Sequence, residues 1–361
     1  MSVRKDEKTN TWYFYGKIYK NGKVVKNYKK RGFKTKRSAM NGETDYLRYY
    51  HESITYKNPP FDELLKEYLD KHKTQVKSST YIANESVYRK TPEWVKEDYQ
   101  NQEILQKYIN ECDSKFSKRH VEKIYYCLNK LFRFGVDNEY IKNNPMNNVT
   151  RDLRKNEKEK EIDFWEKEEF DKFIECMNDP IQHAFFSTLY YMGLRKGECQ
   201  ALTWNDVDFN NKTITINKIV SHKHFKGENP ITTPKTKNSY RTISMPDVLT
   251  GELRVLYSIE RDFKAFREDS FVFGVNRWIP SETLRRTLKK GIEKANVKYI
   301  TIHGFRHSHA SYLINNMGKN NYSDYDIAQR LGDTVETLHR VYAHWFVKKD
   351  KEIIDFMNKN E

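Results

Sequence analysis

Apolar positions near the start of the chain are dense and mostly aromatic, and lysines lie between and after them. Residues 11–19 (TWYFYGKIY) are rich in aromatic and β-branched side chains, which predicts a strand. Asn21-Gly22, directly after them, favours a tight hairpin turn. Residues 23–30 and 32–33 are expected to supply two more short strands, and Thr35 is expected to cap a helix over residues 36–51. The pattern therefore predicts a small sheet followed by one helix.

The pattern of apolar residues becomes helical after the chain-breaking pair Pro59-Pro60. Apolar residues recur at steps of three and four over 61–69 and again over 121–132, which predicts the core of a helical unit. Asn143-Asn144-Pro145 is expected to end this unit. Residues 151–161 are strongly charged and have no apolar period, which is typical of an exposed linker.

Charge adds a class of partner to this picture. The 361 residues include 65 Lys and Arg against 50 Asp and Glu, a net charge of +15, and the first 60 residues hold 15 against 5. Such an excess predicts a polyanionic partner, namely nucleic acid. Aromatic residues interleaved with lysines on a thin sheet suit a surface that enters a DNA groove and reads sequence. Contact with phosphates alone is the alternative.

Several classes of protein are excluded by what the sequence lacks. No apolar run approaches the roughly 20 residues that a membrane-spanning helix needs. The N-terminus has no apolar segment typical of a secretory signal. The four cysteines form no CxxC pair, so neither a disulfide framework nor a zinc ribbon is indicated. We therefore expect a protein of the cytoplasm, without a membrane partner.

Basic residues occur at the ends of predicted elements in the C-terminal half. An apolar helix is expected to end at Gly193, which places Arg195 on a turn where its planar fork can bind a phosphate. Lys235 lies in a loop between two predicted strands, where it can protonate a leaving oxygen. His303 and Arg306 are three residues apart, so they share one face at the start of a helix.

A further segment, residues 323–345, contains a candidate nucleophile. Ser323 and Asp326 resemble a capping box, Leu331-Gly332 is expected to end that helix, and Thr334 to cap a following helix that contains Tyr342. A tyrosine has an ordinary pKa of about 10 and needs help to attack at neutral pH. Arginines that polarise a phosphodiester would give that help. His307 and His309 lie near His303 in sequence, but no cysteine accompanies them, so a zinc site is not favoured.

Together these motifs resemble the active site of the tyrosine recombinases, and more narrowly that of the integrases of phages and integrative mobile elements. The motifs are Arg195 in GLRKGE, Lys235 in PKTK, His303-x-x-Arg306, and Tyr342 nine residues after Leu-Gly-x. The resemblance covers nearly the whole chain. It implies a multidomain, mainly α fold with small β elements: a three-stranded sheet plus helix that binds arm sites (1–57), a helical core-binding domain (58–150), a linker (151–163) and a mixed α+β catalytic domain with a C-terminal tail (164–361).

The resemblance also implies roles for the matching residues. Arg195 and Arg306 would hold the scissile phosphate, Lys235 would protonate the departing 5′ oxygen, and His303 would assist proton transfer. Tyr342 would attack and form a 3′-phosphotyrosyl bond. No cofactor and no metal ion is expected, because arginine and lysine supply the positive charge.

The implied partners are the core and arm attachment sites of double-stranded DNA, a homotetramer, a host bending factor and an excisionase. The implied location is the nucleoid of a bacterial host cell. A type IB topoisomerase-like enzyme and a noncatalytic DNA-binding regulator are the alternatives to a site-specific recombinase that integrates or excises a mobile element. The apolar stripe of the tail, residues 353–357, packs either on a neighbouring protomer or back on its own domain.

One position departs from the family pattern. The family usually places a histidine after Leu-Gly, whereas this chain has Asp333, and an ionised aspartate repels a phosphate. Three interpretations remain open. Asp333 braces Arg306 or another basic group, or it turns away as a helix cap while His344 or another donor substitutes, or the enzyme is impaired.

Overall fold

The computed structural model describes residues 3–20, 23–52, 56–151, 162–234, 237–317 and 320–346. The chain divides into two compact units, Met1–Glu159 and Lys160–Glu361. Within the described residues, no helix is both long enough and apolar enough to cross a membrane. The finer domain boundaries stay predictions.

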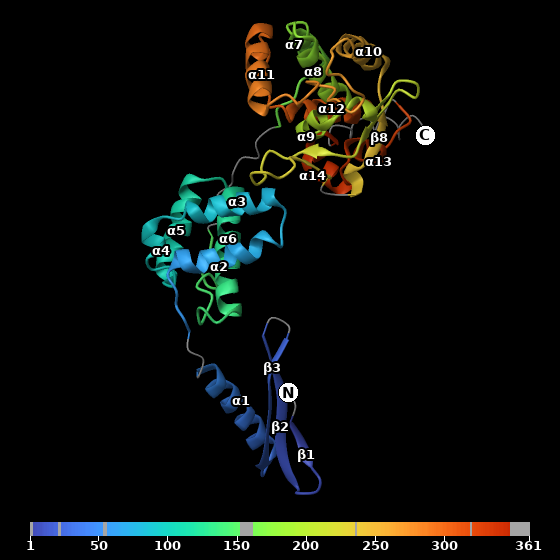
Figure 1. Cartoon of the computed structure of the whole chain (residues 1–361). Helices are drawn as coiled ribbons and strands as arrows, with labels where there is room; N and C mark the ends of the chain where they lie inside the picture. The colour runs from blue at the N-terminus through green and yellow to red at the C-terminus, as the bar shows by residue number, and fades with distance from the viewer. Residues whose placement is uncertain are drawn as a thin grey trace, which may run out of the picture. The chain divides into compact units, whose positions relative to one another are not determined.

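The N-terminal segment forms an antiparallel three-stranded sheet next to one helix (Figure 1). The strands lie in the order β1 (Val3–Asp6), β2 (Thr11–Lys20) and β3 (Lys23–Phe33), and α1 (Lys36–Glu52) follows. Phe14 of β2 and Ala39 of α1 are fully buried, so one face of the sheet packs on the helix. The Ser38 N–H donates to the Thr35 hydroxyl at 3.0 Å, which confirms the predicted cap of α1.

Two of the strand predictions are wrong in detail. Val3–Asp6 forms an edge strand that the sequence analysis missed, because its polar residues show no alternation. Residues 32–33 belong to the single strand β3 and not to a strand of their own. Phe14 pairs with Lys30 and Trp12 with Phe33, so β3 has one extra residue there. Gly32, with φ of +93°, lies in this bulge and lets the strand continue.

The helical unit has the predicted apolar cores. Its helices are α2 (Phe61–Lys73), α3 (Ser78–Arg89), α4 (Glu93–Lys96), α5 (Gln102–Lys115) and α6 (Lys118–Asp137). The stripe of α2 is buried, and so are the stripe residues of α6 except Tyr125, which is half-buried and whose hydroxyl donates to the Val149 carbonyl at 3.2 Å. The helices α2, α3, α5 and α6 thus pack around one apolar centre.

The C-terminal unit combines helices with two small sheets. Its helices are α7 (Lys167–Ile174), α8 (Pro180–Met192), α9 (Lys196–Ala201), α10 (Asp247–Arg261), α11 (Ser281–Ala295), α12 (Gly304–Asn316), α13 (Asp324–Leu331) and α14 (Val335–Phe346), with 3₁₀ turns η1 (Trp204–Asp206) and η2 (Lys237–Ser239). Its strands are β4 (Val207–Asp208), β5 (Thr213–Ile216), β6 (Ile219–Val220), β7 (Ile231–Thr232) and β8 (Arg241–Ser244). β5 pairs antiparallel with β4 and β8, and β6 pairs with β7.

Two apolar cores hold the helices that matter for the site. Aromatic rings of α7, α8 and α12 pack on one another in the larger core, where the Phe173 and Phe305 centroids lie 5.7 Å apart. A smaller core joins α12, α13 and α14 and includes Tyr342. The first turn of α12 therefore lies between the two cores, and its side chains are held on a rigid support.

Candidate active site

Arg195 is held at the junction of two helices. Gly193 ends α8 with φ of +63°, a backbone conformation that residues other than glycine rarely adopt. Arg195 is the N-cap of α9. Its backbone N–H donates to Glu198 Oε2 at 3.0 Å, and its Nη1 donates to Glu198 Oε1 at 2.9 Å. The predicted turn is thus present, and a glutamate one turn into α9 fixes the direction of the guanidinium.

Glu198 also binds a second arginine. The Nη2 of Arg241, on β8, donates to Glu198 Oε2 at 2.9 Å, and Glu198 is 1% exposed. Burial by itself raises the pKa of Glu198, but Arg241 and Arg195 outweigh burial and hold that pKa below its ordinary value. The sequence analysis missed both residues. The three-residue spacing from Arg195 to Glu198, typical of a capping box, was a usable signal for Glu198, whereas nothing local marks Arg241.

Arg306 is buried at the predicted place. It lies in the first turn of α12, with His303 as the N-cap, and is 2% exposed. Its Nη1 donates to the Gly193 carbonyl at 2.8 Å. This bond joins the start of α12 to the end of α8, so Arg306 and Arg195 are brought together by the same turn.

Asp333 connects the two arginines. Its Oδ1 accepts a hydrogen bond from Arg195 and its Oδ2 one from Arg306. Gly332 ends α13 with φ of +67°, and a Cβ there would lie 3.0 Å from the Asn238 carbonyl oxygen, so a larger residue would strain this turn. The carboxylate faces the arginines, as in the interpretation that it braces basic groups, and does not turn away. Whether His344 contributes lies outside the described side chains.

Tyr342 lies on α14 close to this cluster. It is 3% exposed, and its hydroxyl lies 2.8 Å from Nδ1 of His307. Burial raises the pKa of Tyr342 to about 12, against the influence of Arg306 and Arg195, which lower it. The arginines are thus near enough to act on the phenol electrostatically. His307 was noted in the sequence analysis only as a neighbour of His303, and the contact with Tyr342 could not be found from spacing.

His303 packs against His307. The two ring centroids are 4.7 Å apart and the rings are nearly perpendicular, at 84°. Burial and the positive charges of Arg306 and Arg195 lower the pKa of His303. His303 is therefore mainly a neutral imidazole at neutral pH, although the sequence analysis paired it with Arg306 as a binder of phosphate.

Two predicted features of the site lie outside the described residues, and so do the predicted turn at Asn21-Gly22 and residues 152–161 of the predicted linker. Lys235 is one of them, although the turn η2 (Lys237–Ser239) begins two residues later. The tail at 353–357 is the other. In the part of the chain that the structure describes, no group of three His, Cys, Asp or Glu side chains is placed to hold a metal ion.

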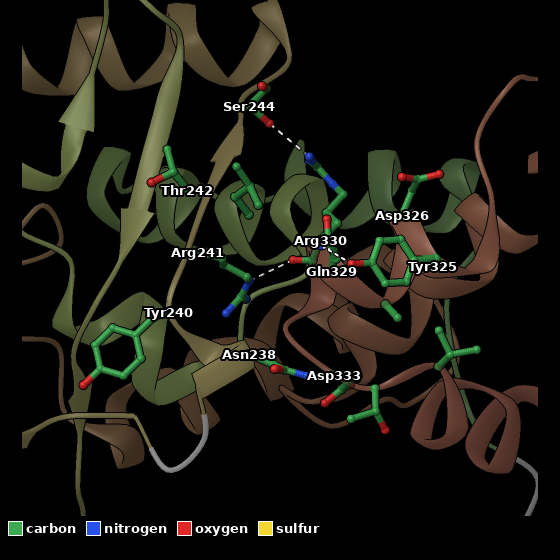
Figure 2. Close-up of a pocket in the computed structure, with 14 residues that line it drawn as sticks. Asn238, Tyr240, Arg241, Thr242, Ser244, Tyr325, Asp326, Gln329, Arg330 and Asp333 are labelled. Carbon is green, nitrogen blue, oxygen red and sulfur yellow. Dashed lines mark hydrogen bonds between the residues drawn. The ribbon is translucent and has the colours of Figure 1, made fainter.

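A groove lies beside the cluster formed by Arg195, Arg306 and Asp333. It has a volume of about 710 Å³ and is lined by β8, α13 and the segment that leads into α14. Figure 2 shows Asp333, Arg241 and Asn238 at one end of the groove, and Tyr325 on the α13 side. The Arg241 side chain is fixed there by a hydrogen bond from its Nε to the Arg330 carbonyl at 2.8 Å. The groove therefore reaches the site only at Asp333 and Arg241, and the buried Arg306 and Tyr342 do not line it.

Comparison with known proteins identifies the family. Residues 163–347 match the model of the phage integrase family, so the chain belongs to that family. It is 30% identical over 345 residues to the ICEBs1 integrase of Bacillus subtilis (strain 168), which covers 89% of each chain. The protein is a tyrosine site-specific recombinase, an integrase of a mobile element.

Solved structures show the same fold. The Tn1549 transposon integrase in complex with transposon right end DNA matches with a TM-score of 0.67 and 16% identity, over 83% of this chain and all of that one. The lambda integrase tetramer bound to a Holliday junction matches with a TM-score of 0.54 and 13% identity, over 92% of this chain and 95% of that one. The mainly helical, multidomain fold class predicted from the sequence is confirmed, and the topoisomerase-like and regulator alternatives are not favoured.

Proposed function

We propose that this integrase cuts and rejoins double-stranded DNA through a 3′-phosphotyrosyl bond on Tyr342. The observation that supports this most directly is the convergence of Tyr342, Arg195 and Arg306 from three separate helical segments. A phosphodiester placed between the two arginines would have its non-bridging oxygens neutralised while the phenol attacks. The oxygens would take the positions that the Asp333 carboxylate holds in the protein without DNA.

The other proposed roles follow the motif. Lys235 protonates the departing 5′ oxygen, and His303 orients the phosphate and assists proton transfer. Rejoining is the reverse step, in which a 5′ hydroxyl attacks the phosphotyrosine, so the energy of the bond is conserved and no nucleotide cofactor is consumed. Asp333 is not a ligand of the phosphate in this scheme. It holds the arginines in place before DNA arrives.

The DNA-binding surfaces are proposed by domain. Residues 1–57 bind arm sites, residues 58–150 bind a core site, residues 164–361 carry out the cleavage, and residues 151–163 are the linker. Four copies act together on two duplexes in the nucleoid, and a host bending factor and an excisionase set the direction. The tetrameric, DNA-bound lambda integrase supports the assembly, because this chain shares its fold.

The exposed face of the N-terminal sheet has the chemistry that an arm-site surface needs. Lys29 lies over the ring of Tyr13, 4.7 Å from its centroid, and Arg4 lies 5.3 Å from the ring centroid of Tyr15. These cations are exposed and the opposite face packs on α1. Replacing Lys29 or Arg4 by alanine should weaken arm-site binding and reduce the slope of log affinity against log salt by about 1 for each lost phosphate contact.

Covalent trapping tests the reaction itself. The DNA that flanks the gene is sequenced to find the core site, and a nicked suicide substrate of that site is incubated with the full-length protein. The wild type should form a covalent protein–DNA adduct, and Tyr342→Phe should form none while it binds the substrate equally well. If the wild type binds but forms no adduct, the protein is a regulator, and if it relaxes supercoiled DNA that lacks the site, it acts as a topoisomerase.

A further inference from the structure

The nucleophile of the proposed reaction has a partner that the matched motif does not include. We propose that His307 is a catalytic residue that takes the proton of Tyr342 as the phenol attacks DNA and returns it when the DNA is rejoined. This inference rests on the proposed function, because it has a meaning only if Tyr342 is the nucleophile.

The geometry places the two reacting atoms in direct contact. Nδ1 of His307 lies 2.8 Å from the hydroxyl oxygen of Tyr342, which is within the normal range for a hydrogen bond. The ring centroids are 5.6 Å apart and the rings are inclined at 70°. His307 lies next to Arg306 in the first turn of α12, and Tyr342 is buried in the core that joins α12 to α14. The contact is therefore built into the packing of two helices.

The surroundings of His307 keep its ring unprotonated before the reaction. Burial first, then His303 and Arg306, lower the pKa of His307 to about 4, so its ring is neutral at neutral pH. A neutral imidazole that accepts at Nδ1 has its own proton on Nε2. The Tyr342 phenol, with a pKa raised to about 12, is protonated at neutral pH and has to lose its proton when it attacks. A bound phosphate would add negative charge next to Arg306 and so favour the protonated ring during the reaction.

The proposed step balances in protons and bonds. The bond from the Tyr342 oxygen to phosphorus forms as the bond from phosphorus to the 5′ oxygen breaks. The phenol proton moves to Nδ1 of His307, and the 5′ oxygen receives a proton from the general acid, which we assign to Lys235. In rejoining, the 5′ oxygen forms its bond to phosphorus and returns its proton to Lys235 as the phosphotyrosyl bond breaks. His307 gives its proton back to the departing phenolate of Tyr342.

A pair of suicide substrates separates this role from that of the general acid. One has the normal 5′ oxygen at the scissile bond and the other has sulfur there, a leaving group that needs no protonation. The variant His307→Asn retains an oxygen near the position of Nδ1 that can accept a hydrogen bond but cannot take up the proton. The exposed His339, on the same helix as Tyr342, offers a matched control as His339→Asn.

We expect His307→Asn to slow adduct formation about 100-fold or more on both substrates, and His339→Asn to leave it unchanged. Lys235→Ala should be slow on the oxygen substrate and restored by sulfur. If sulfur also restores His307→Asn, the histidine acts on the leaving group, and the inference is wrong. A wild-type rate for His307→Asn overturns it as well.

A second measurement excludes a merely structural effect. A fluorinated tyrosine at position 342 has a more acidic phenol and depends less on a base, so it should restore much of the activity that His307→Asn has lost. A misfolded or mispositioned active site would not be restored in this way. If the wild type forms no adduct with either substrate, the proposed function fails, whereas a failure of the inference leaves the wild-type adduct intact.

Discussion

Replacing Asp333 by asparagine should destabilise the protein without DNA and make it sensitive to small anions. The substitution removes the negative charge that Arg195 and Arg306 share. Arg306 is 2% exposed and Asp333 is 19% exposed, so the pair is largely withdrawn from water. Removing one partner of a buried ion pair costs about 3–5 kcal/mol, because the other charge stays buried without compensation.

The structure places this variant at the low end of that range. Arg306 retains its bond to the Gly193 carbonyl, and Arg195 retains Glu198. We therefore expect a loss of about 3 kcal/mol in the free energy of unfolding. For a unit of this size each kcal/mol lowers the melting temperature by roughly 2–4 °C, so the transition should shift by roughly 6–12 °C.

Sulfate provides the critical comparison. Sulfate can bind between Arg195 and Arg306 when the carboxylate is gone. At a sulfate concentration of 100 times its dissociation constant, this binding would raise the free energy of unfolding by about 2.7 kcal/mol. Scanning calorimetry of the full chain is done in sulfate and in chloride at equal ionic strength, with Asp247→Asn as the control. Asp247 is an exposed carboxylate paired with Lys212, so its loss should change little. Since sulfate stabilises most proteins, only an excess in Asp333→Asn counts.

Equal stabilisation of all three proteins by sulfate would refute the reasoning, and so would an unchanged melting temperature for Asp333→Asn. The companion variant Asp333→His tests the same position with DNA present. Histidine can donate a hydrogen bond to the phosphate, so we expect faster adduct formation on the nicked substrate. A loss of activity would show instead that aspartate has an adapted role in this enzyme.

Two further predictions concern buried carboxylates. Glu198→Gln should lower the free energy of unfolding at pH 7 by about 3–5 kcal/mol in urea, because it leaves Arg241 and Arg195 without their shared partner. Since the pKa of Glu198 is held low in the folded state, this contribution is lost as pH falls through that pKa, and the two proteins should converge in acid. Glu260 is fully buried and accepts a hydrogen bond from Trp204. Burial raises the pKa of Glu260 to about 7. A raised carboxyl pKa means that the folded state loses stability as pH rises above about 5. Glu260→Gln should therefore be more stable than wild type by roughly 3 kcal/mol at pH 8. At pH 4 it should have no such advantage. The prediction is wrong if urea unfolding gives the same difference in stability between Glu260→Gln and wild type at pH 4 and at pH 8.

Local features were within reach of the sequence. The apolar end of α8 at Gly193, the capping box of Ser323 and Asp326, and the cap at Thr35 were predicted because each depends on residues within a few positions of one another. The edge strand Val3–Asp6 was missed for the converse reason. Its hydrogen bonds come from β2, and nothing in its own four residues requires a strand.

The sequence by itself determined the excess of positive charge, the local signals that end and cap helices, and the short motifs that resemble the tyrosine recombinases. The tertiary structure alone decided how the charges are paired. Arg195 and Asp333 are 138 positions apart, and Arg241 reaches Glu198 across 43. The contact between His307 and Tyr342 spans 35 positions and depends on how α12 packs on α14. Periodicity fixes which face of an element a side chain occupies, whereas the partner it meets there depends on the packing of distant segments.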